Sequence, residues 1–173
     1  MTMELTASPS NVLCNEHSGI SEHAAKEIGV SLAALLADLF AVYVKTKNFH
    51  WHVTGPHFHD YHRMFDEQAN QILGSTDLVA ERARKLGVPA LKSISDIASK
   101  QRVRDNDDAY VPAPAMLSEL QQNNRYLAEQ MRGLHELCEE LSDIATAGLI
   151  ETLIDEAEQR AWFLQASQAM PSG

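Results

Sequence analysis

Apolar residues recur at helical spacing along most of this chain. From residue 21 to residue 53 they follow steps of three and four, at Ile28, Leu32, Leu35, Leu36, Leu39, Val42 and Tyr43. This spacing places them on one face of a helix. Ser21 is a candidate N-cap, and Gly55-Pro56 breaks the pattern because proline has no backbone N–H to donate. The pattern predicts a long first helix, with Pro56 suited to start the next one.

The same spacing predicts three further long helices and a short one, over residues 57–86, 93–100, 115–141 and 142–169. Gly87 and Pro89 are stop signals after the second long helix. Pro112 and Pro114 precede the third. The breaks after the first and third long helices are short, whereas the middle connection is long. This connectivity predicts an all-α, four-helix bundle with one crossover that carries the short helix.

Composition agrees with one globular domain, because 173 residues at 45% hydrophobic content are enough for a single core. Residues 1–20 mix Ser, Asn, Pro and Gly without periodicity, so we predict a flexible N-terminal arm. The bundle is expected over residues 21–169, followed by a short tail at 170–173. No internal repeat, Gly-rich phosphate loop or strand-like alternation competes with the helical interpretation.

Charge and cysteine content narrow the class of protein. A formal net charge of -10 and a pI near 5.2 argue against general attraction to nucleic acid or anionic membranes. Two cysteines, Cys14 and Cys138, do not make a secretory disulfide framework. The N-terminus lacks a basic region followed by an apolar one, and no uncharged run reaches membrane-spanning length. We expect a cytoplasmic protein, with nucleoid association as a variant of that location.

The most informative chemistry lies on the second predicted helix. His62 and Asp66 are four residues apart, as are Asp77 and Glu81, so each pair presents two potential metal ligands on one helix face. Such a pair alone is more often an ordinary surface hydrogen bond. Two pairs on one helix of a bundle favour a metal site, to which His50, at the end of the first helix, could add a ligand.

The distance between the pairs indicates how such a site is built. Asp66 and Asp77 are eleven positions apart, which is about 16 Å along a helix axis. No single metal centre spans that distance. An antiparallel copy of the helix, crossing near Gln71 and Ile72, would place His62 and Asp66 of one chain against Asp77 and Glu81 of the other. The spacing therefore predicts a two-fold dimer with two equivalent metal sites.

Imidazole and carboxylate ligands together suit Fe(II), Mn(II) or Zn(II), with positions left open for an oxidant. The sequence lacks the motifs of two other familiar kinds of metal site. A di-iron site inside one bundle needs Glu-x-x-His motifs on two helices, and this chain contains none. A zinc protease needs His-Glu-x-x-His, which is also absent.

Several stretches of the chain carry a family resemblance: Lys47-Asn48-Phe49-His50-Trp51-His52-Val53-Thr54-Gly55, then Phe58, His62, Phe65 and Asp66, then Asp77-Leu78-Val79-Ala80-Glu81-Arg82, and finally Asp143-Ile144-Ala145-Thr146-Ala147 and Trp162. Together with the four-helix layout, they resemble the signature of the Dps family, the ferritin-like miniferritins. The resemblance implies a hollow dodecamer built from two-fold dimers. Each two-fold interface would hold a ferroxidase centre that oxidises Fe(II), preferentially with hydrogen peroxide. Ferric mineral would be stored inside, which protects against oxidative damage.

By position, the resemblance makes His50, His62 and Asp66 ligands from one subunit, and Asp77 and Glu81 ligands from its partner. The spacing of the two pairs had already indicated that division. Iron is then the expected metal, with Zn(II) or Mn(II) as substitutes.

Other residues near the motif take lesser roles. Trp51 resembles the family's site-adjacent tryptophan, although a lone Trp is more often a core anchor. His52, His57 and His59 receive no ligand role. Asp143 resembles part of the family's three-fold pore, so we predict a place for it on an iron entry path. Ten acidic residues against three arginines lie between residues 119 and 160. Most belong to a solvated face, and some would face the cavity of a hollow shell.

The alternative function is DNA binding and compaction, with the metal site secondary. Dps members commonly use lysine-rich terminal arms for DNA, but residues 1–25 contain no Lys or Arg, and residues 166–173 carry no charge. Half of the basic residues do lie between Arg82 and Arg104. A surface patch there would bind phosphate groups weakly.

Overall fold

The structure, a computed structural model, describes residues 19–168. The predicted C-terminal tail and nearly all of the predicted N-terminal arm lie outside these residues. The described chain consists of helices and connections without strands, in the order α1 (Glu22–His52), α2 (Phe58–Lys85), α3 (Ile94–Lys100), α4 (Ala113–Glu140) and α5 (Ile144–Ala166). The predicted all-α class is confirmed.

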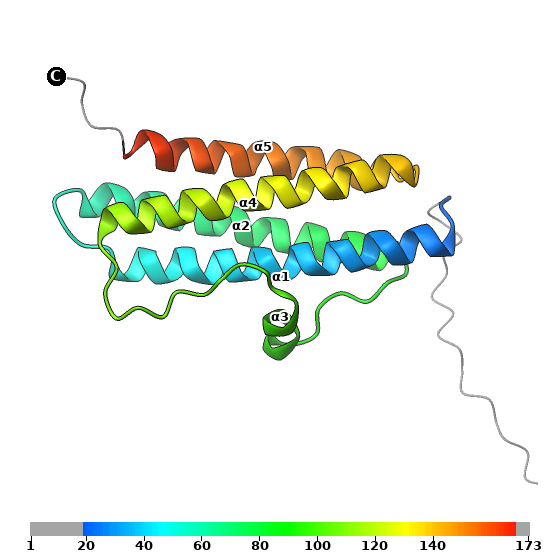
Figure 1. Cartoon of the computed structure of the whole chain (residues 1–173), viewed down its shortest axis with the longest axis horizontal. Helices are drawn as coiled ribbons and strands as arrows, with labels where there is room; N and C mark the ends of the chain where they lie inside the picture. Colours follow the sequence, from blue (N-terminus) through cyan, green and yellow to red (C-terminus); the bar gives the residue numbers. More distant parts are fainter. Residues whose placement is uncertain (1–18, 169–173) are drawn as a thin grey trace, which may run out of the picture.

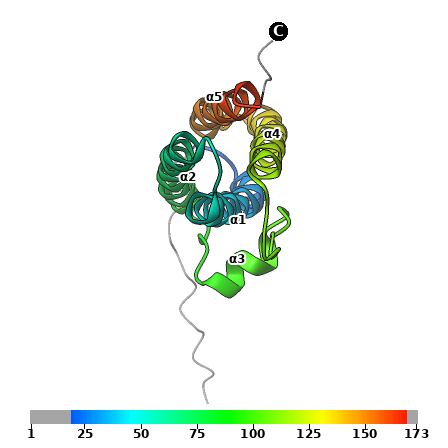
Figure 2. The same cartoon turned by 90° about the vertical axis from the view of Figure 1, so that its left-hand side faces the viewer.

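Four long helices form a bundle, and α3 lies outside it (Figure 1). Helices α1 and α2 form one antiparallel hairpin and α4 and α5 the other. Seen along the bundle, the order around the ring is α1, α2, α5, α4, with α3 beyond α1 (Figure 2). The connection from α2 to α4 runs back along the outside of α1, because α4 begins at the end of the bundle where α2 also begins. This is the predicted crossover topology.

The ends of α1 and α2 confirm one predicted cap and correct one predicted helix start. Ser21 caps α1 as predicted, since its Oγ accepts the N–H of Ala24 at 3.2 Å. Helix α2 begins at Phe58 rather than at Pro56, which lies in a turn. Gly55 has a φ of 112° and its carbonyl accepts the N–H of Phe58, so this turn takes up the residues predicted as the helix start.

A residue with a left-handed φ also sets two further helix ends. Gly87, at φ 81°, ends α2, and the N–H of Val88 donates to the carbonyl of Ala83, as in a Schellman motif. Helix α5 begins at Ile144, two residues later than predicted. Ser142 takes a left-handed φ of 60° and Asp143 becomes the N-cap.

The core is divided into two clusters of buried side chains. The larger one fills most of the bundle and includes Leu32, Leu35 and Ile72. The smaller one lies where α1 ends and α2 begins, and it joins residues of α1, α2, α4 and α5, among them Phe49 and Phe65. Phe49 directly precedes His50, and Phe65 directly precedes Asp66. This second cluster therefore fixes the backbone that carries the predicted ligands.

Two buried charged residues of α1 hold the crossover against the bundle. Asp38 is completely buried and accepts the backbone N–H of Arg102 at 2.6 Å and its guanidinium at 2.7 and 2.9 Å. Lys45 donates to the carbonyl of Arg104 and lies 2.8 Å from the Glu119 carboxylate. Both charges have partners, as buried charges require.

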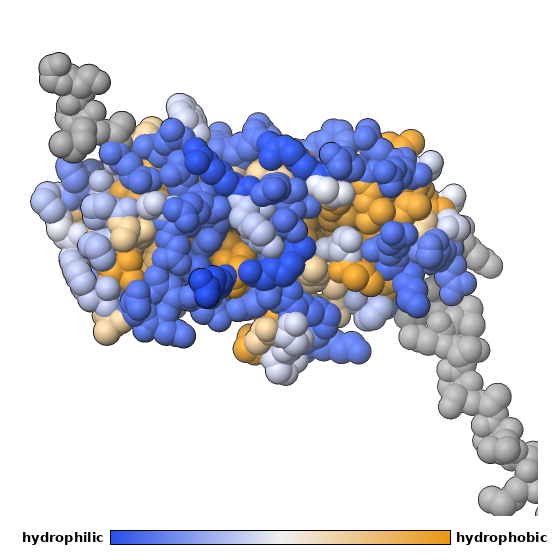
Figure 3. Space-filling model, in the orientation of Figure 1, coloured by the Kyte–Doolittle hydropathy of each residue, from blue (hydrophilic) through white to orange (hydrophobic). Residues whose placement is uncertain are grey.

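Helix α1 is long and apolar enough to cross a bilayer by composition alone. Its most apolar window has a mean hydropathy of 1.8, and 56% of that window is buried inside the bundle. The same residues supply much of the larger core cluster. The face drawn in Figure 3 is mainly hydrophilic, with separate apolar patches.

Candidate metal centre

His50 and His62 face each other across the α1–α2 hairpin. Their rings stack with centres 3.8 Å apart and planes 23° apart. His50 Nδ1 lies 2.7 Å from the carbonyl oxygen of His62, and His62 Nδ1 lies 2.8 Å from the carbonyl oxygen of His50. A carbonyl only accepts hydrogen bonds, so each Nδ1 carries the hydrogen. In the neutral rings this leaves a lone pair on each Nε2, as ligation of a metal by that atom requires.

Asp66 lies one turn after His62 on α2, and its Oδ1 is 3.9 Å from His50 Nε2. The same oxygen lies 2.6 Å from Lys47 Nζ, while Oδ2 accepts a longer hydrogen bond from Asn70 at 3.4 Å. The hydrogen bond from Lys47 is the main reason that the pKa of Asp66 is lowered, and burial of the carboxyl acts in the opposite direction. Asp66 is therefore a carboxylate near neutral pH, and it lies beside the His50 ring.

The remaining predicted ligands, Asp77 and Glu81, lie further along α2 and are exposed to solvent. Glu81 Oε2 is 3.2 Å from Lys85 Nζ, in a pair that is exposed on both sides. Within residues 19–168 of one subunit, no group of three or more His, Cys, Asp or Glu side chains is arranged to hold a metal ion. Association of the two halves across a dimer axis stays a prediction.

Sequence reasoning missed Lys47 as a functional residue. It precedes His50 by three positions, so both side chains fall on the same side of α1. Its ammonium also lies 5.9 Å from the ring centre of Trp51, which is itself 63% exposed. Lys47 is part of the sequence motif around His50, but only its distance to Asp66 shows which residue it contacts.

The other histidines of this region make local contacts. His52 Nδ1 lies 2.8 Å from the carbonyl of Asn48. His59 is exposed, with its Nδ1 3.8 Å from a carboxylate oxygen of Asp60. Neither contact involves a predicted ligand.

Asp143 is engaged within its own subunit. Its side chain is 3% exposed, accepts the N–H of Thr146 at 3.1 Å, and lies 2.6 Å from a guanidinium nitrogen of Arg82. These contacts give it a structural role as the cap of α5. Its predicted place on an iron entry path stays a prediction.

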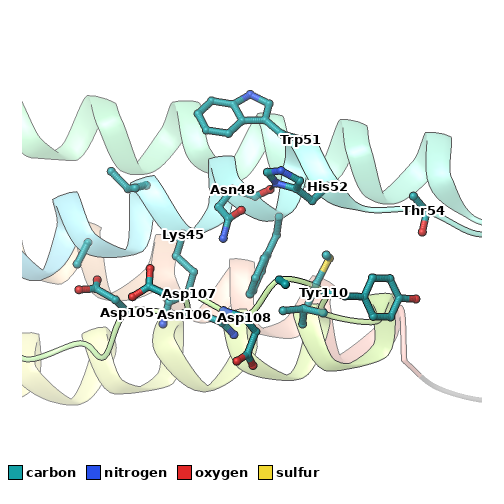
Figure 4. A pocket seen from close by; sticks show the side chains of 16 residues that line it. Lys45, Asn48, Trp51, His52, Thr54, Asp105, Asn106, Asp107, Asp108 and Tyr110 are labelled. Carbon is teal, nitrogen blue, oxygen red and sulfur yellow. Dashed lines mark hydrogen bonds between the residues drawn. The ribbon is translucent and has the colours of Figure 1, made fainter.

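A cavity of about 620 Å³ lies between the end of α1 and the crossover. Figure 4 shows Trp51 and His52 on the α1 side of this cavity and Asp108 and Tyr110 on the crossover side. None of the five predicted ligands lines it. The candidate metal centre is therefore a separate surface, formed by the neighbouring faces of α1 and α2.

Comparison with known proteins gives consistent results. Residues 31–169 match the family model of the ferritin-like domain. The chain is 30% identical over 132 residues to a low temperature-induced protein of Nostoc sp., covering 76% of this chain and 74% of the relative. It is 28% identical over 157 residues to DNA protection during starvation protein 1 of Deinococcus radiodurans, covering 91% and 75%.

Among solved structures, a Dps protein from Vibrio cholerae superposes with a TM-score of 0.86 at 25% identity, covering 92% of this chain and all of that one. That protein is described as a member of a broad superfamily of ferritin-like diiron-carboxylate proteins.

Proposed function

This chain belongs to the Dps proteins of the ferritin-like family, and on that basis we propose that it oxidises and stores iron. Fe(II) is the substrate, hydrogen peroxide the oxidant, and ferric mineral in the hollow of a dodecamer the product. Two Fe(II) ions each give one electron to a peroxide molecule, whose O–O bond breaks to give two hydroxide ions. Iron and peroxide are removed together, so hydroxyl radicals are not formed from them.

The observation that carries this proposal is the reciprocal bonding of His50 and His62. Each ring is fixed by its Nδ1 to the other's backbone, so each Nε2 is held as an acceptor without further rearrangement. The ionised Asp66 adds negative charge beside them. This ligand chemistry suits Fe(II) and leaves coordination positions for peroxide.

The partner subunit would supply Asp77 and Glu81 in the proposed dimer. The His62–Asp66 and Asp77–Glu81 pairs are placed symmetrically about the 71–72 peptide, so an antiparallel α2 crossing there would align both pairs at once. Leu73 lies seven residues after Asp66, on the same helix face. Its side chain is 40% exposed, so it offers an apolar contact near the axis.

The test is the rate of Fe(II) oxidation after anaerobic addition of hydrogen peroxide, followed by ferric absorbance on a size-selected sample. We expect fast oxidation, with ferric iron eluting with a large particle. Asp77→Ala with Glu81→Ala should abolish the fast phase while the helical circular dichroism is retained. Asp60→Ala with Glu67→Ala removes two exposed acids from the same helix and should leave the rate unchanged. Equal rates in both double variants would refute the site.

DNA compaction is the second candidate, and the structure weakens it. Of the seven basic residues between Arg82 and Arg104, four are ion-paired to carboxylates: Arg82, Lys85, Lys100 and Arg102. The surface patch therefore has less free charge than the sequence suggests. We expect a mobility shift of duplex DNA only at low ionic strength, because phosphate contacts weaken steeply with salt. A shift that persists at physiological salt would favour this candidate.

A further inference from the structure

The side-chain ammonium of Lys47 already lies in the candidate metal centre. The ammonium of Lys47 is 2.6 Å from Asp66 Oδ1, the oxygen that faces His50 Nε2 at 3.9 Å. The Lys47 side chain is 18% exposed and the Asp66 side chain 42% exposed, so this pair is partly shielded from water on the lysine side. The carboxylate oxygen that faces His50 thus already accepts a charge-assisted hydrogen bond from Lys47.

We infer that Lys47 is a tethered counter-ion that occupies the metal position on Asp66, so that binding of a divalent cation is an exchange in which Lys47 is displaced. This inference rests on the proposed function of the site. It adds that Lys47 sets how tightly the site holds a divalent cation. Lys47 is a positioning residue here, because it acts through Asp66.

The charge of the empty site explains why such a residue is useful. The proposed interface brings together the carboxylates of Asp66, Asp77 and Glu81, with neutral imidazoles, and like charges at short range repel strongly. Lys47 neutralises Asp66, and Lys85 lies beside Glu81 in the other half of the site. The two lysines leave one net negative charge per metal-free site instead of three, so the subunits can associate before iron binds.

Lys47 can be displaced because its ammonium has an alternative favourable contact. Its ammonium is already 5.9 Å from the ring centre of Trp51, within the range of a cation–π contact. A small movement of the flexible lysine side chain towards that ring would free the Asp66 oxygen, and the face of the ring would still attract the ammonium.

The experiment is a calorimetric titration of the metal-free oligomer with Zn(II), which binds without redox chemistry. Lys47→Met removes the competing cation and keeps an unbranched side chain only one atom shorter, so we expect Zn(II) to bind about tenfold more tightly than to wild type, equivalent to about 1.4 kcal/mol. Lys47→Arg keeps the charge and should stay within threefold of wild type. Lys100→Met is the matched control, because it also breaks a lysine–carboxylate pair, with Asp96 on α3, that involves no predicted ligand; we expect a change below threefold.

Asp66→Ala and His62→Ala separate the two levels of the proposal. If both variants bind Zn(II) as wild type does, the site itself is wrong, and the proposed function fails with it. If both lose the binding but Lys47→Met binds Zn(II) no more tightly than wild type, the exchange model alone is overturned. Lys47→Gln provides a second neutral variant, and it should show the same tightening as Lys47→Met.

Discussion

The contact between Lys47 and Asp66 makes a pH-dependent prediction. The pKa of Asp66 is lowered chiefly by the lysine hydrogen bond, so replacing Lys47 with Met should raise it towards the ordinary value of about 3.9. Carboxyl carbon chemical shifts, followed by NMR in the metal-free protein, measure this pKa directly. An identical pKa in the two proteins would show that the ammonium does not hold the carboxylate in solution.

The sign of the linked stability effect follows from that direction. A carboxyl whose pKa is lower in the folded state stabilises the fold above its unfolded pKa, and this stabilisation is lost as the pH falls through the folded value. The stability difference between wild type and Lys47→Met should therefore shrink below pH 4. It should also be small at neutral pH, at most about 1 kcal/mol, because the Asp66 side chain is 42% exposed.

At the level of elements, the docking of the crossover depends on Asp38. Asp38→Ala leaves the buried N–H of Val103 and the N–H and guanidinium of Arg102 without their acceptor. The guanidinium of Arg102 is 41% exposed and stays hydrated, so the cost comes mainly from the unpaired backbone N–H groups and should be about 1–3 kcal/mol. Urea unfolding at fixed protein concentration should show that loss. The crossover should also become more sensitive to protease between residues 101 and 108.

Glu67→Ala is the control for that experiment, because it breaks only the exposed pair with Arg63. Its cost should be small, because an exposed ion pair contributes little to stability. Losses of equal size in Asp38→Ala and Glu67→Ala would mean that Asp38 does not anchor the crossover.

The helices could be predicted from the sequence because their apolar positions repeat over many turns, whereas the exact starts of three of them could not. Helix α4 begins at Ala113, two residues earlier than predicted, because Pro114 fits within its first turn. Pro56 has a suitable φ for a first helical turn, but Gly55 adopts a left-handed φ that moves the start to Phe58. Ser142 likewise adopts a left-handed φ, and the capping role falls to Asp143. A single backbone angle decides the starts of α2 and α5, and periodicity does not encode it. Nor does it encode which acid is buried, as with Asp38.

At the level of the whole molecule, the sequence predicts a metal centre made by two subunits, and the structure of one subunit can show only its own half of that centre. Helical spacing put His62 and Asp66 on one face, and the structure adds the reciprocal bonds between His50 and His62 that fix both rings. Those bonds involve backbone carbonyls twelve residues apart, which no motif spacing reveals. Contact between this half and Asp77 and Glu81 requires a second copy, so it has to be tested in the assembled protein.

Mixing inactive subunits provides that test. His62→Ala alone and Asp77→Ala with Glu81→Ala should each abolish fast Fe(II) oxidation, since each removes ligands from both centres of a homodimer. In a mixed dimer the two defects fall on the same centre, and the other centre receives wild-type ligands from both subunits. Random reassembly of equal amounts makes half of the dimers mixed, so about a quarter of the wild-type rate should return.

Reassembly by dilution from denaturant, followed by the peroxide-driven oxidation assay, measures this recovery. Each variant reassembled alone is the control, and it should stay inactive. If all five ligands belonged to one subunit, no mixture of these variants could contain a complete centre, and the rate would remain at the level of the controls. Recovery of activity on mixing therefore depends on the division of ligands between subunits, whatever the size of the final cage.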